Sequence, residues 1–353
     1  MVIIFTAMEV NVHTFKLNLD WNLMGLVSQI DRFDATWSSI EKKEGQGLRQ
    51  LKSVATVRSV GASTRIEGAT MSDEEIAVLI SKINVSKFED RDEQEASGYF
   101  NTHNLITESF DDIHIGESEL KSLHNTLLKQ SEKDAWHRGA YKKHSNVVEL
   151  TKSDGQSEVV FRPTEPGFPT DSAMQALVEW YESDEETHPL VRCAIFSYEF
   201  VSIHPFQDGN GRLSRLLSTL LLLKHGYVWI QYVSFEHEIE RRKNEYYGAL
   251  RKCQSGRPGE NITPWVLFFL DALKNIQDQL IQKLIATGIE SQLSPKEKAI
   301  LAFISNHPGS RSGEVARRLG IPSPTAKRLI SMLLEQGLIQ KYGTGPGTNY
   351  SMA

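Results

Sequence analysis

The sequence has few cysteines and no long apolar run. Only two cysteines occur in 353 residues, Cys193 and Cys253, and their separation fits neither a zinc site nor a disulfide framework. This scarcity indicates a reducing compartment. The most apolar stretches, residues 216–223 and 265–270, are far shorter than the roughly 20 residues that a membrane helix needs, and the N-terminus lacks the pattern of a signal peptide. We therefore expect a cytoplasmic protein with no membrane segment.

The charge is unevenly distributed along the chain. Lys and Arg number 39 and Asp and Glu 45, which gives a net charge of −6. From Leu293 onward, however, eight basic residues stand against three acidic ones, a local charge of +5 that leaves −11 for the first 292 residues. At roughly 150 residues per domain, the length predicts about two domains. Only the last 60 or so residues have a charge that suits a nucleic-acid partner.

Hydrophobic periodicity predicts a mainly α fold. Apolar residues three and four positions apart indicate helices from about residue 21 to 127 and again from about 171 to 286. Between these stretches, residues 139–169 contain two short apolar segments around Ser153-Asp154-Gly155, the pattern of a β-hairpin with a tight turn. One hairpin within a helical chain indicates an appended flap.

The pattern changes again after Leu293. Helices are predicted for residues 294–306, 312–319 and 323–336, and strands for residues 338–342 and 349–352 on either side of a Gly-rich turn. Three short helices followed by a hairpin are typical of a winged helix-turn-helix domain. The Gln-rich residues 277–292 would connect it to the rest of the chain.

The most informative stretch runs from His204 to Arg215, with the sequence HPFQDGNGRLSR. Two glycines flank Asn210 directly before an apolar helix, so backbone N–H groups and the helix N-terminus can bind a phosphate together. Arg212 and Arg215 lie three positions apart on the first helical turn, where both guanidinium groups can contact phosphate oxygens. This pattern predicts a polyphosphate ligand.

Two further side chains of this stretch suggest catalysis. Asp208 is a hard oxygen ligand suited to a magnesium ion shared with phosphates. His204 has an ordinary pKa close to neutrality and is the candidate general base, while Phe206 is expected to point inward and hold the loop. Each residue alone would also suit a structural turn with surface arginines. The combination within twelve positions favours a catalytic phosphate site.

The same stretch resembles the signature of the Fic family, His-Pro-Phe-x-Asp/Glu-Gly-Asn-Gly-Arg-x-x-Arg, at every position. The resemblance implies an all-helical Fic core and the transfer of AMP from ATP to a Ser, Thr or Tyr hydroxyl of a protein, this protein itself included. It implies His204 as the base, Asp208 as the Mg²⁺ ligand, Gly209, Asn210 and Gly211 as the anion hole, and Arg212 and Arg215 as phosphate contacts. Gly211 followed by Arg212 resembles the adenylylating branch rather than the Doc-like branch, which transfers a phosphate.

A second motif resembles the inhibitory helix of the family, Ser/Thr-x-x-x-Glu-Gly/Asn. It is Ser63-Thr64-Arg65-Ile66-Glu67-Gly68, and the resemblance implies that Glu67 pairs with Arg215 and occupies the γ-phosphate position. Alone, these six residues would equally suit an ordinary helix with a Ser cap. The family organisation divides the chain into an N-terminal helical region, 1–110, with the inhibitory helix at about 60–70, a Fic catalytic domain, 111–285, and a winged helix, 293–353.

Three weaker features complete the expected site. The hairpin strand with Val160 and Phe161 falls where the family places a flap that binds the target peptide as an added strand, although the usual paired prolines are absent. Tyr246, Tyr247 and Gln254 resemble the segment that borders the nucleoside, but such aromatic residues also suit a core. The acidic runs 89–95 and 182–186 are interpreted as solvated faces.

The C-terminal domain suggests a second ligand. Ser323 would cap the recognition helix, Thr325 could reach a base edge, and Lys327 and Arg328 could contact DNA phosphates. A winged helix used only for packing or for forming a homodimer fits the same pattern.

The leading hypothesis is therefore a protein adenylyltransferase that uses ATP and Mg²⁺ and is inhibited by Glu67. One alternative keeps the fold and reverses the chemistry, with Glu67 positioning a water molecule that removes AMP from a modified target. The other is a DNA-binding regulator whose Fic core senses a nucleotide.

Overall fold

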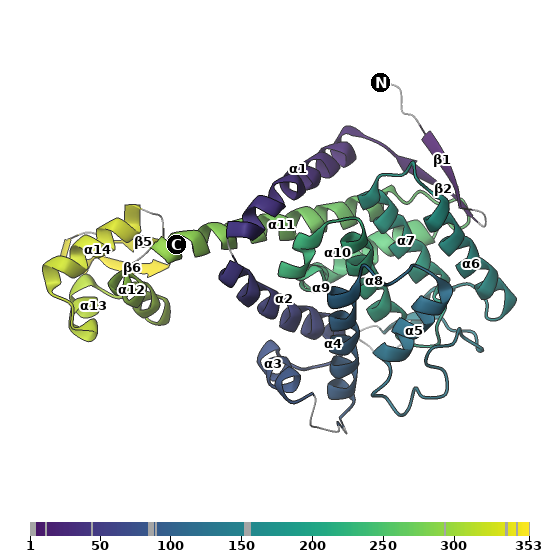
Figure 1. Ribbon diagram of the computed structural model, residues 1–353, viewed down its shortest axis with the longest axis horizontal. Coiled ribbons are helices and arrows are strands. Elements are labelled where there is room, and N and C mark those ends of the chain that lie inside the picture. Colours follow the sequence, from purple (N-terminus) through teal and green to yellow (C-terminus); the bar gives the residue numbers. More distant parts are fainter. Residues whose placement is uncertain are drawn as a thin grey trace. The chain divides into compact units, whose positions relative to one another are not determined.

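The computed structural model describes residues 5–10, 13–43, 45–83, 88, 90–151, 157–292, 294–335, 338–343 and 345–352. The chain divides into two compact units, Met1–Gln279 and Leu280–Ala353. Helices dominate the described residues of both units, as the periodicity predicts (Figure 1). Within this described part, none of the helices combines the length and the apolar character that crossing a bilayer requires.

The first unit contains most of the helices. They are α1 (Trp21–Lys43), α2 (Gly45–Ile66), α3 (Asp73–Lys82), α4 (Arg91–Ser109), α5 (Glu117–Leu127), α6 (Phe168–Ser183), α7 (Pro189–Ile203), α8 (Asn210–Lys224), the 3-10 helix η1 (Val228–Tyr232), α9 (Phe235–Arg241), α10 (Lys243–Gln254) and α11 (Thr263–Gln292). The Gln-rich stretch expected as the connector is the second half of α11, which continues into the second unit.

Helix α8 lies in the interior of this unit, in contact with α2, α4, α5, α7 and α9 (Figure 1). Its leucines are buried around the whole circumference, so neighbouring helices must cover every side. Helix α7 is equally apolar and runs beside α8, and the hydroxyls of Ser197 and Ser218 hydrogen-bond between them at 2.8 Å. The loop that carries the Fic-like motif joins these two buried helices and is therefore anchored at both ends.

Two antiparallel hairpins accompany the helices of the first unit. The hairpin of β1 (Phe5–Val10) and β2 (His13–Asn18) was not predicted, because the sequence analysis assigned no element before residue 21. Its alternation is nevertheless clear in β2, where Phe15 and Leu17 are buried and Lys16 between them is exposed. The backbone of Lys16 exchanges hydrogen bonds with Glu260 and Ile262, so the hairpin is fixed to the segment before α11.

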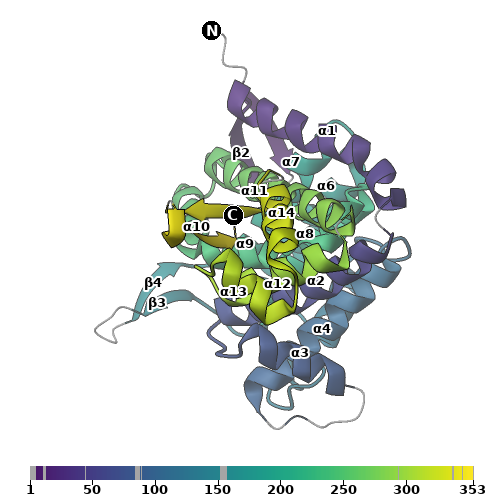
Figure 2. The same cartoon turned by 90° about the vertical axis from the view of Figure 1, so that its left-hand side faces the viewer.

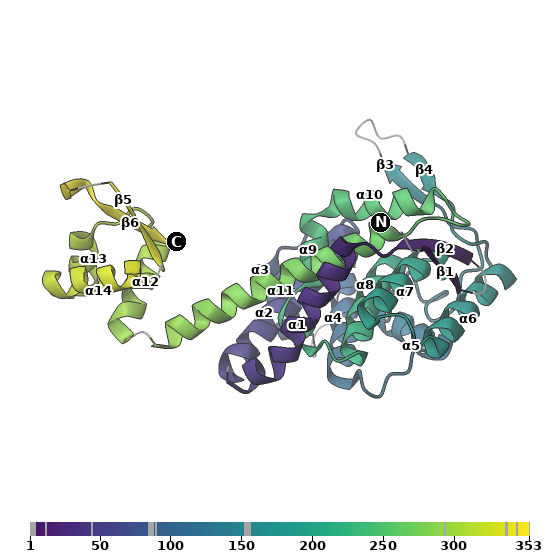
Figure 3. The same ribbon diagram turned by 90° about the horizontal axis from the view of Figure 1, so that it is seen from above.

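The second hairpin, β3 (Val148–Thr151) with β4 (Ser157–Phe161), is the flap that the sequence predicts. It projects from the helical body beside α10 (Figure 2, Figure 3). Val148 pairs with Phe161, and Thr151 pairs with Ser157. The expected turn at Asp154-Gly155 lies outside the described residues.

The second unit is the predicted winged helix. It consists of α12 (Pro295–Asn306), α13 (Ser312–Leu319), α14 (Ser323–Glu335) and the antiparallel strands β5 (Ile339–Tyr342) and β6 (Asn349–Met352). A capping box of Ser294 and Glu297 starts α12, and Gly320 ends α13 in the left-handed conformation. Ser323, expected as a cap, is the first residue of α14. The helices enclose a small core built around Ile300, Ile304, Val315, Leu329, Ile330 and Leu333.

Close packing of α4 against α5 gives a test of the fold. A Cβ on Gly98 would overlap the carbonyl oxygen of Leu127, whereas a Cβ on Gly25 in α1 would meet nothing within 4 Å. We expect Gly98→Ala to destabilise the protein by about 1–3 kcal/mol through overpacking, and Gly25→Ala to stabilise it by about 0.5–1 kcal/mol through helix propensity. Urea-induced unfolding measures both changes in the free energy of unfolding. Equal stability of the two variants would contradict this packing.

Candidate functional site

A cavity of about 830 Å³ lies in the first unit, where α8 begins. This volume is within the range of about 300–1,000 Å³ that is usual for ligand pockets. The predicted site residues that line the cavity are Glu67, Phe161, His204, Asp208, Gly209, Asn210, Gly211, Arg212, Arg215, Tyr246, Tyr247 and Gln254. The structure thus brings together residues from α2, β4, the α7–α8 loop and α10. The side chain of Val160 lies outside the described part of the chain.

The α7–α8 loop is held in shape by Asn210. The side-chain oxygen of Asn210 accepts the N–H of Phe206 at 2.8 Å, and its side-chain nitrogen donates to the carbonyl of the same residue at 2.7 Å. Gly209, with a φ of 78°, occupies a left-handed conformation that glycine adopts without strain. The buried Asn210 side chain therefore shapes the loop, and the backbone N–H groups at the start of α8 lie along the cavity wall.

His204 occupies a strained backbone position at the end of α7. With a φ of 54°, it is the one non-glycine residue with a positive φ in the described part of the chain, a conformation that costs about 1–2 kcal/mol. Its Nδ1 lies 3.3 Å from the carbonyl oxygen of Val201. Because a carbonyl can only accept, Nδ1 carries the proton and Nε2 has the free lone pair. Burial lowers the pKa of His204 to about 4, so the imidazole is neutral at pH 7 and can accept a proton.

His124 in α5 supports the loop from behind, and sequence reasoning missed it. The N–H of Gly139 donates to His124 Nδ1 at 2.9 Å, so His124 Nε2 carries a proton, which it donates to the carbonyl of Asp208 at 3.0 Å. Its ring stacks on Phe206 with a centroid distance of 3.8 Å. Burial lowers the pKa of His124 to about 4, which keeps the ring in this neutral form. An isolated His on an amphipathic helix gives no signal of this role.

Asp208 has the properties of a magnesium ligand shared with a nucleotide. Partial burial would raise the pKa of its carboxyl, but the charge of Arg212 and the N–H of Gly209 outweigh this effect and hold the pKa below its usual value. About 43% of the side chain is exposed. Among the described residues, no group of three or more His, Cys, Asp or Glu side chains could bind a metal alone. One carboxylate beside a phosphate site still fits Mg²⁺, which usually takes one or two carboxylates together with phosphate oxygens and water.

Arg212 is partly neutralised by acidic side chains. Its Nη1 lies 3.1 Å from Glu95 Oε2 and its Nη2 lies 3.5 Å from Asp208 Oδ1. Glu95 also accepts from Arg91 at 2.8 Å, and both residues line the cavity. The interpretation of run 89–95 as a solvated face is therefore wrong for Glu95, which is 8% exposed. A run of acidic residues in the sequence does not show which of them contacts an arginine 117 positions away.

Arg215 is almost completely buried and is bound by the end of α2. Its Nη2 donates to Glu67 Oε1 at 2.7 Å and to the carbonyl of Ser63 at 3.0 Å, and its Nε donates to the Ser63 hydroxyl at 2.8 Å. Burial alone would raise the pKa of Glu67 and lower that of Arg215. The ion pair nevertheless lowers the pKa of Glu67 and raises that of Arg215. A Cβ on Gly211 would overlap Glu67 Oε1, so glycine is required for this close approach.

The remaining predicted residues lie on two different units. Tyr246 and Tyr247 line the cavity with their rings 5.0 Å apart, and Gln254 donates to the Ser202 hydroxyl at 3.0 Å. In the second unit, the side chains of Lys327 and Arg328 on α14 are exposed and that of Thr325 is half-buried.

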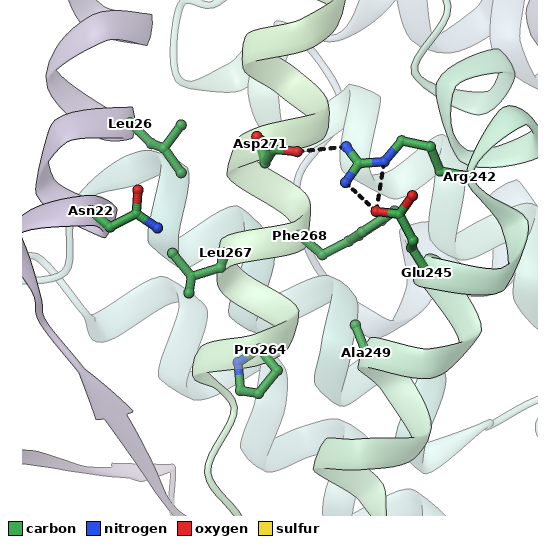
Figure 4. Close-up of a pocket in the computed structure, with 9 residues that line it drawn as sticks. All are labelled: Asn22, Leu26, Arg242, Glu245, Ala249, Pro264, Leu267, Phe268 and Asp271. Atoms are coloured by element: carbon green, nitrogen blue, oxygen red, sulfur yellow. Dashed lines mark hydrogen bonds and ion pairs between the residues drawn. The ribbon is translucent and has the colours of Figure 1, made fainter.

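A second hollow of about 450 Å³ lies between α1, α10 and α11 (Figure 4). Its wall is mostly apolar, and its one arginine, Arg242, donates to Asp271 at 2.6 Å and to Glu245 at 2.6 Å (Figure 4). Because two carboxylates already neutralise this guanidinium, the hollow does not offer an anion site comparable with the first cavity.

Comparison with known proteins agrees with this geometry. The Fic/DOC family model matches residues 114–222, and the MarR family model matches residues 291–346. A solved Fic family protein from Desulfovibrio desulfuricans has a TM-score of 0.60 at 25% identity, covering 95% of this chain and 97% of that one. A Fic domain containing signaling protein from Bacteroides thetaiotaomicron has a TM-score of 0.55 at 23% identity, covering 73% and 94%. The chain therefore carries a Fic domain, followed by a MarR-like winged helix.

Some proteins with a similar sequence have names that state an enzymatic activity. A protein named protein adenylyltransferase Fic from Drosophila yakuba is 35% identical over 107 residues, which are 30% of this chain and 20% of that protein. A second protein of this name, from Drosophila virilis, is 31% identical over 165 residues, 42% of this chain and 32% of that protein. The chain thus spans between a fifth and a third of the length of these relatives.

The protonation state of His204 can be tested directly. Because burial lowers its pKa from 6.5 to about 4, we expect its ring resonances to show no titration between pH 8 and about pH 5.5 in an NMR titration. The signal is assigned by its absence from the spectrum of His204→Gln. A midpoint near 6.5 would contradict the burial of the ring.

Proposed function

We propose that this protein transfers AMP from ATP to a hydroxyl group of a protein, itself included, and that Glu67 inhibits the reaction. The observation that supports this proposal best is one cavity lined by the His204 imidazole, the Asp208 carboxylate, two arginines and the start of α8. The names of the curated relatives point in the same direction. We assign residues 1–110 to the inhibitory region, 111–285 to the catalytic domain and 293–353 to the winged helix, and we place the protein in the cytoplasm.

The proposed reaction is a displacement at the α-phosphorus of ATP. Nε2 of His204 accepts the proton of the attacking hydroxyl, the new oxygen–phosphorus bond forms, and the bond to pyrophosphate breaks. The anion hole of Gly209, Asn210 and Gly211, together with Arg212 and Arg215, binds the phosphates and stabilises the developing charge. Mg²⁺ held by Asp208 would neutralise phosphate charge when bound. The flap residues Val160 and Phe161 would hold the target segment as an added strand, and Tyr246, Tyr247 and Gln254 would border the nucleoside.

Inhibition follows from competition for one guanidinium. Glu67 occupies Nη2 of Arg215 at 2.7 Å, and a γ-phosphate would need the same donor. A charge-assisted hydrogen bond of this kind contributes about 1.5–3 kcal/mol. The two anions cannot share the site, because like charges at that distance repel strongly.

We expect Glu67→Gly to increase AMP incorporation from labelled ATP at least about tenfold, because about 1.4 kcal/mol of lost competition corresponds to a factor of ten. Within this variant, His204→Ala should lower the rate by about 10²–10⁴-fold through loss of the general base. Glu74→Ala, which removes an exposed carboxylate of α3, is the control and should leave the rate unchanged. Intact mass and peptide mapping identify the adduct and the acceptor. An unchanged rate in Glu67→Gly would contradict the inhibitory role.

Removal of AMP from a modified protein is the alternative chemistry at this site. It needs the Glu67 carboxylate to position a water molecule, so Glu67→Gly should abolish removal while it increases transfer. Incubating an adenylylated protein with both forms separates the two reactions.

The second unit supports DNA binding as a separate candidate function. Lys327 and Arg328 are exposed on the third helix of a MarR-like winged helix, where such residues contact phosphates. In this reading the Fic domain would act as a nucleotide sensor for the regulator.

We expect the full chain to bind duplex DNA with an affinity that falls steeply as salt rises. Replacing both Lys327 and Arg328 by Ala should reduce the slope of log affinity against log salt by about 2, because each lost phosphate contact removes about 0.9. Replacing the exposed Lys296 and Lys298 of α12 by Ala changes the charge equally and serves as the control. Fluorescence anisotropy measures the slopes. Equal slopes for both double variants, or no binding at low salt, would contradict this function.

A further inference from the structure

Lys142 is a buried cation that the proposed reaction does not use. It follows the loop after α5, its side chain is 2% exposed, and it does not line the cavity. A buried ammonium is costly unless it is well hydrogen-bonded. The hydrogen-bond partners of Lys142 therefore indicate which part of the fold this side chain holds in place.

Lys142 binds the carbonyls of the two residues that flank His204. Its Nζ donates to the carbonyl of Ile203 at 3.2 Å, and its backbone N–H donates to the carbonyl of Pro205 at 2.8 Å. The carbonyl of Ile203 is one of the acceptors left without a helical partner at the end of α7. A cation at this end also interacts favourably with the helix dipole.

Asn146 extends the same set of contacts by one residue. Its side-chain oxygen accepts from Lys142 Nζ at 3.0 Å, and its side-chain nitrogen donates to the carbonyl of Phe206 at 3.0 Å. Three carbonyls close to His204, those of residues 203, 205 and 206, are thus held by one short segment. We call residues 142–146 the carbonyl clamp.

This clamp contributes to keeping the unusual backbone of His204. A left-handed conformation at a non-glycine residue persists only where the surroundings fix it, and Lys142 binds the carbonyl of the peptide directly before His204 and the carbonyl of Pro205, the residue after it. If the Ile203 carbonyl lost the Lys142 donor, the imidazole would move from its place in the cavity, while the hydrogen bond from His124 to the Asp208 carbonyl would still hold the loop directly before α8.

We propose that the Lys142 side chain is a positioning residue for the base His204, acting through the hydrogen bond from its Nζ to the Ile203 carbonyl. The inference rests on the proposed AMP transfer. It predicts an effect on the rate of the chemical step and none on ATP binding, a separation that a general loss of stability would not produce.

The test uses the full chain with Glu67→Gly, in which inhibition is removed. Adding Lys142→Met keeps the length and removes the charge and the donors. We expect kcat to fall about tenfold to a hundredfold, the loss typical of a catalytic group displaced by about 1 Å. The KM for ATP and the ATP-induced rise in melting temperature should stay within about twofold of the parent values. If the Met variant does not fold, Lys142→Gln, which retains a donor, is measured against the same criteria.

Tyr227→Phe is the matched control. It removes a half-buried hydrogen bond of 2.8 Å to Asp31 that lies outside the cavity, and it should leave kcat unchanged. A kcat within twofold of the parent, or a loss seen only in the KM for ATP, would overturn the assignment of Lys142. An inactive Glu67→Gly protein would instead contradict AMP transfer itself, and the role of Lys142 would fall with it.

Discussion

The site depends on the electrostatic requirement of one buried guanidinium. Arg215 is 2% exposed and lies on α8, where an unpaired cation would be strongly destabilising. The folded chain meets this requirement with Glu67 and with both oxygens of Ser63. The end of α2 and Glu67 directly after it are therefore bound to α8 by the guanidinium that the proposed function assigns to a phosphate. In the proposed function, inhibition and the stability of the free protein have one physical cause.

The second constraint is the shape of the α7–α8 loop. Its backbone groups are bound from three directions, by Asn210 within the loop, by His124 from α5, and by Lys142 and Asn146 from the following segment. These contacts place the His204 ring and the start of α8 on one cavity wall without any contribution from a ligand. Such preorganisation is what a reaction dominated by charge stabilisation requires of a protein.

The sequence predicted those parts of this arrangement that depend on neighbours along the chain. The loop, the flap hairpin and the three short helices of the winged helix follow from local turn residues, caps and periodicity. Helix α13 has the predicted bounds, and α12 begins one residue later than predicted, because Ser294 is its N-cap. The family motifs also led to the expectation that Glu67 meets Arg215, 148 positions away, and the structure contains this ion pair. His124, Glu95 and Lys142 were missed because their partners lie far along the chain, and their residue types alone suit a helix face or a solvated surface. The β1–β2 hairpin was missed because a short alternation such as that of Phe15 and Leu17, the buried residues among its described side chains, is a weak signal of a strand.

In the proposed function, Gly211 connects inhibition with phosphate binding. Its missing Cβ leaves the space into which Glu67 reaches to bind Arg215. The same bare backbone would let a phosphate approach the N–H groups at the start of α8. In the proposed function, a side chain at position 211 would crowd both the Glu67 carboxylate and a bound phosphate. Release of the inhibition would then come from movement or loss of Glu67 itself, directly after α2, where 34% of its side chain is exposed and Gly68 follows.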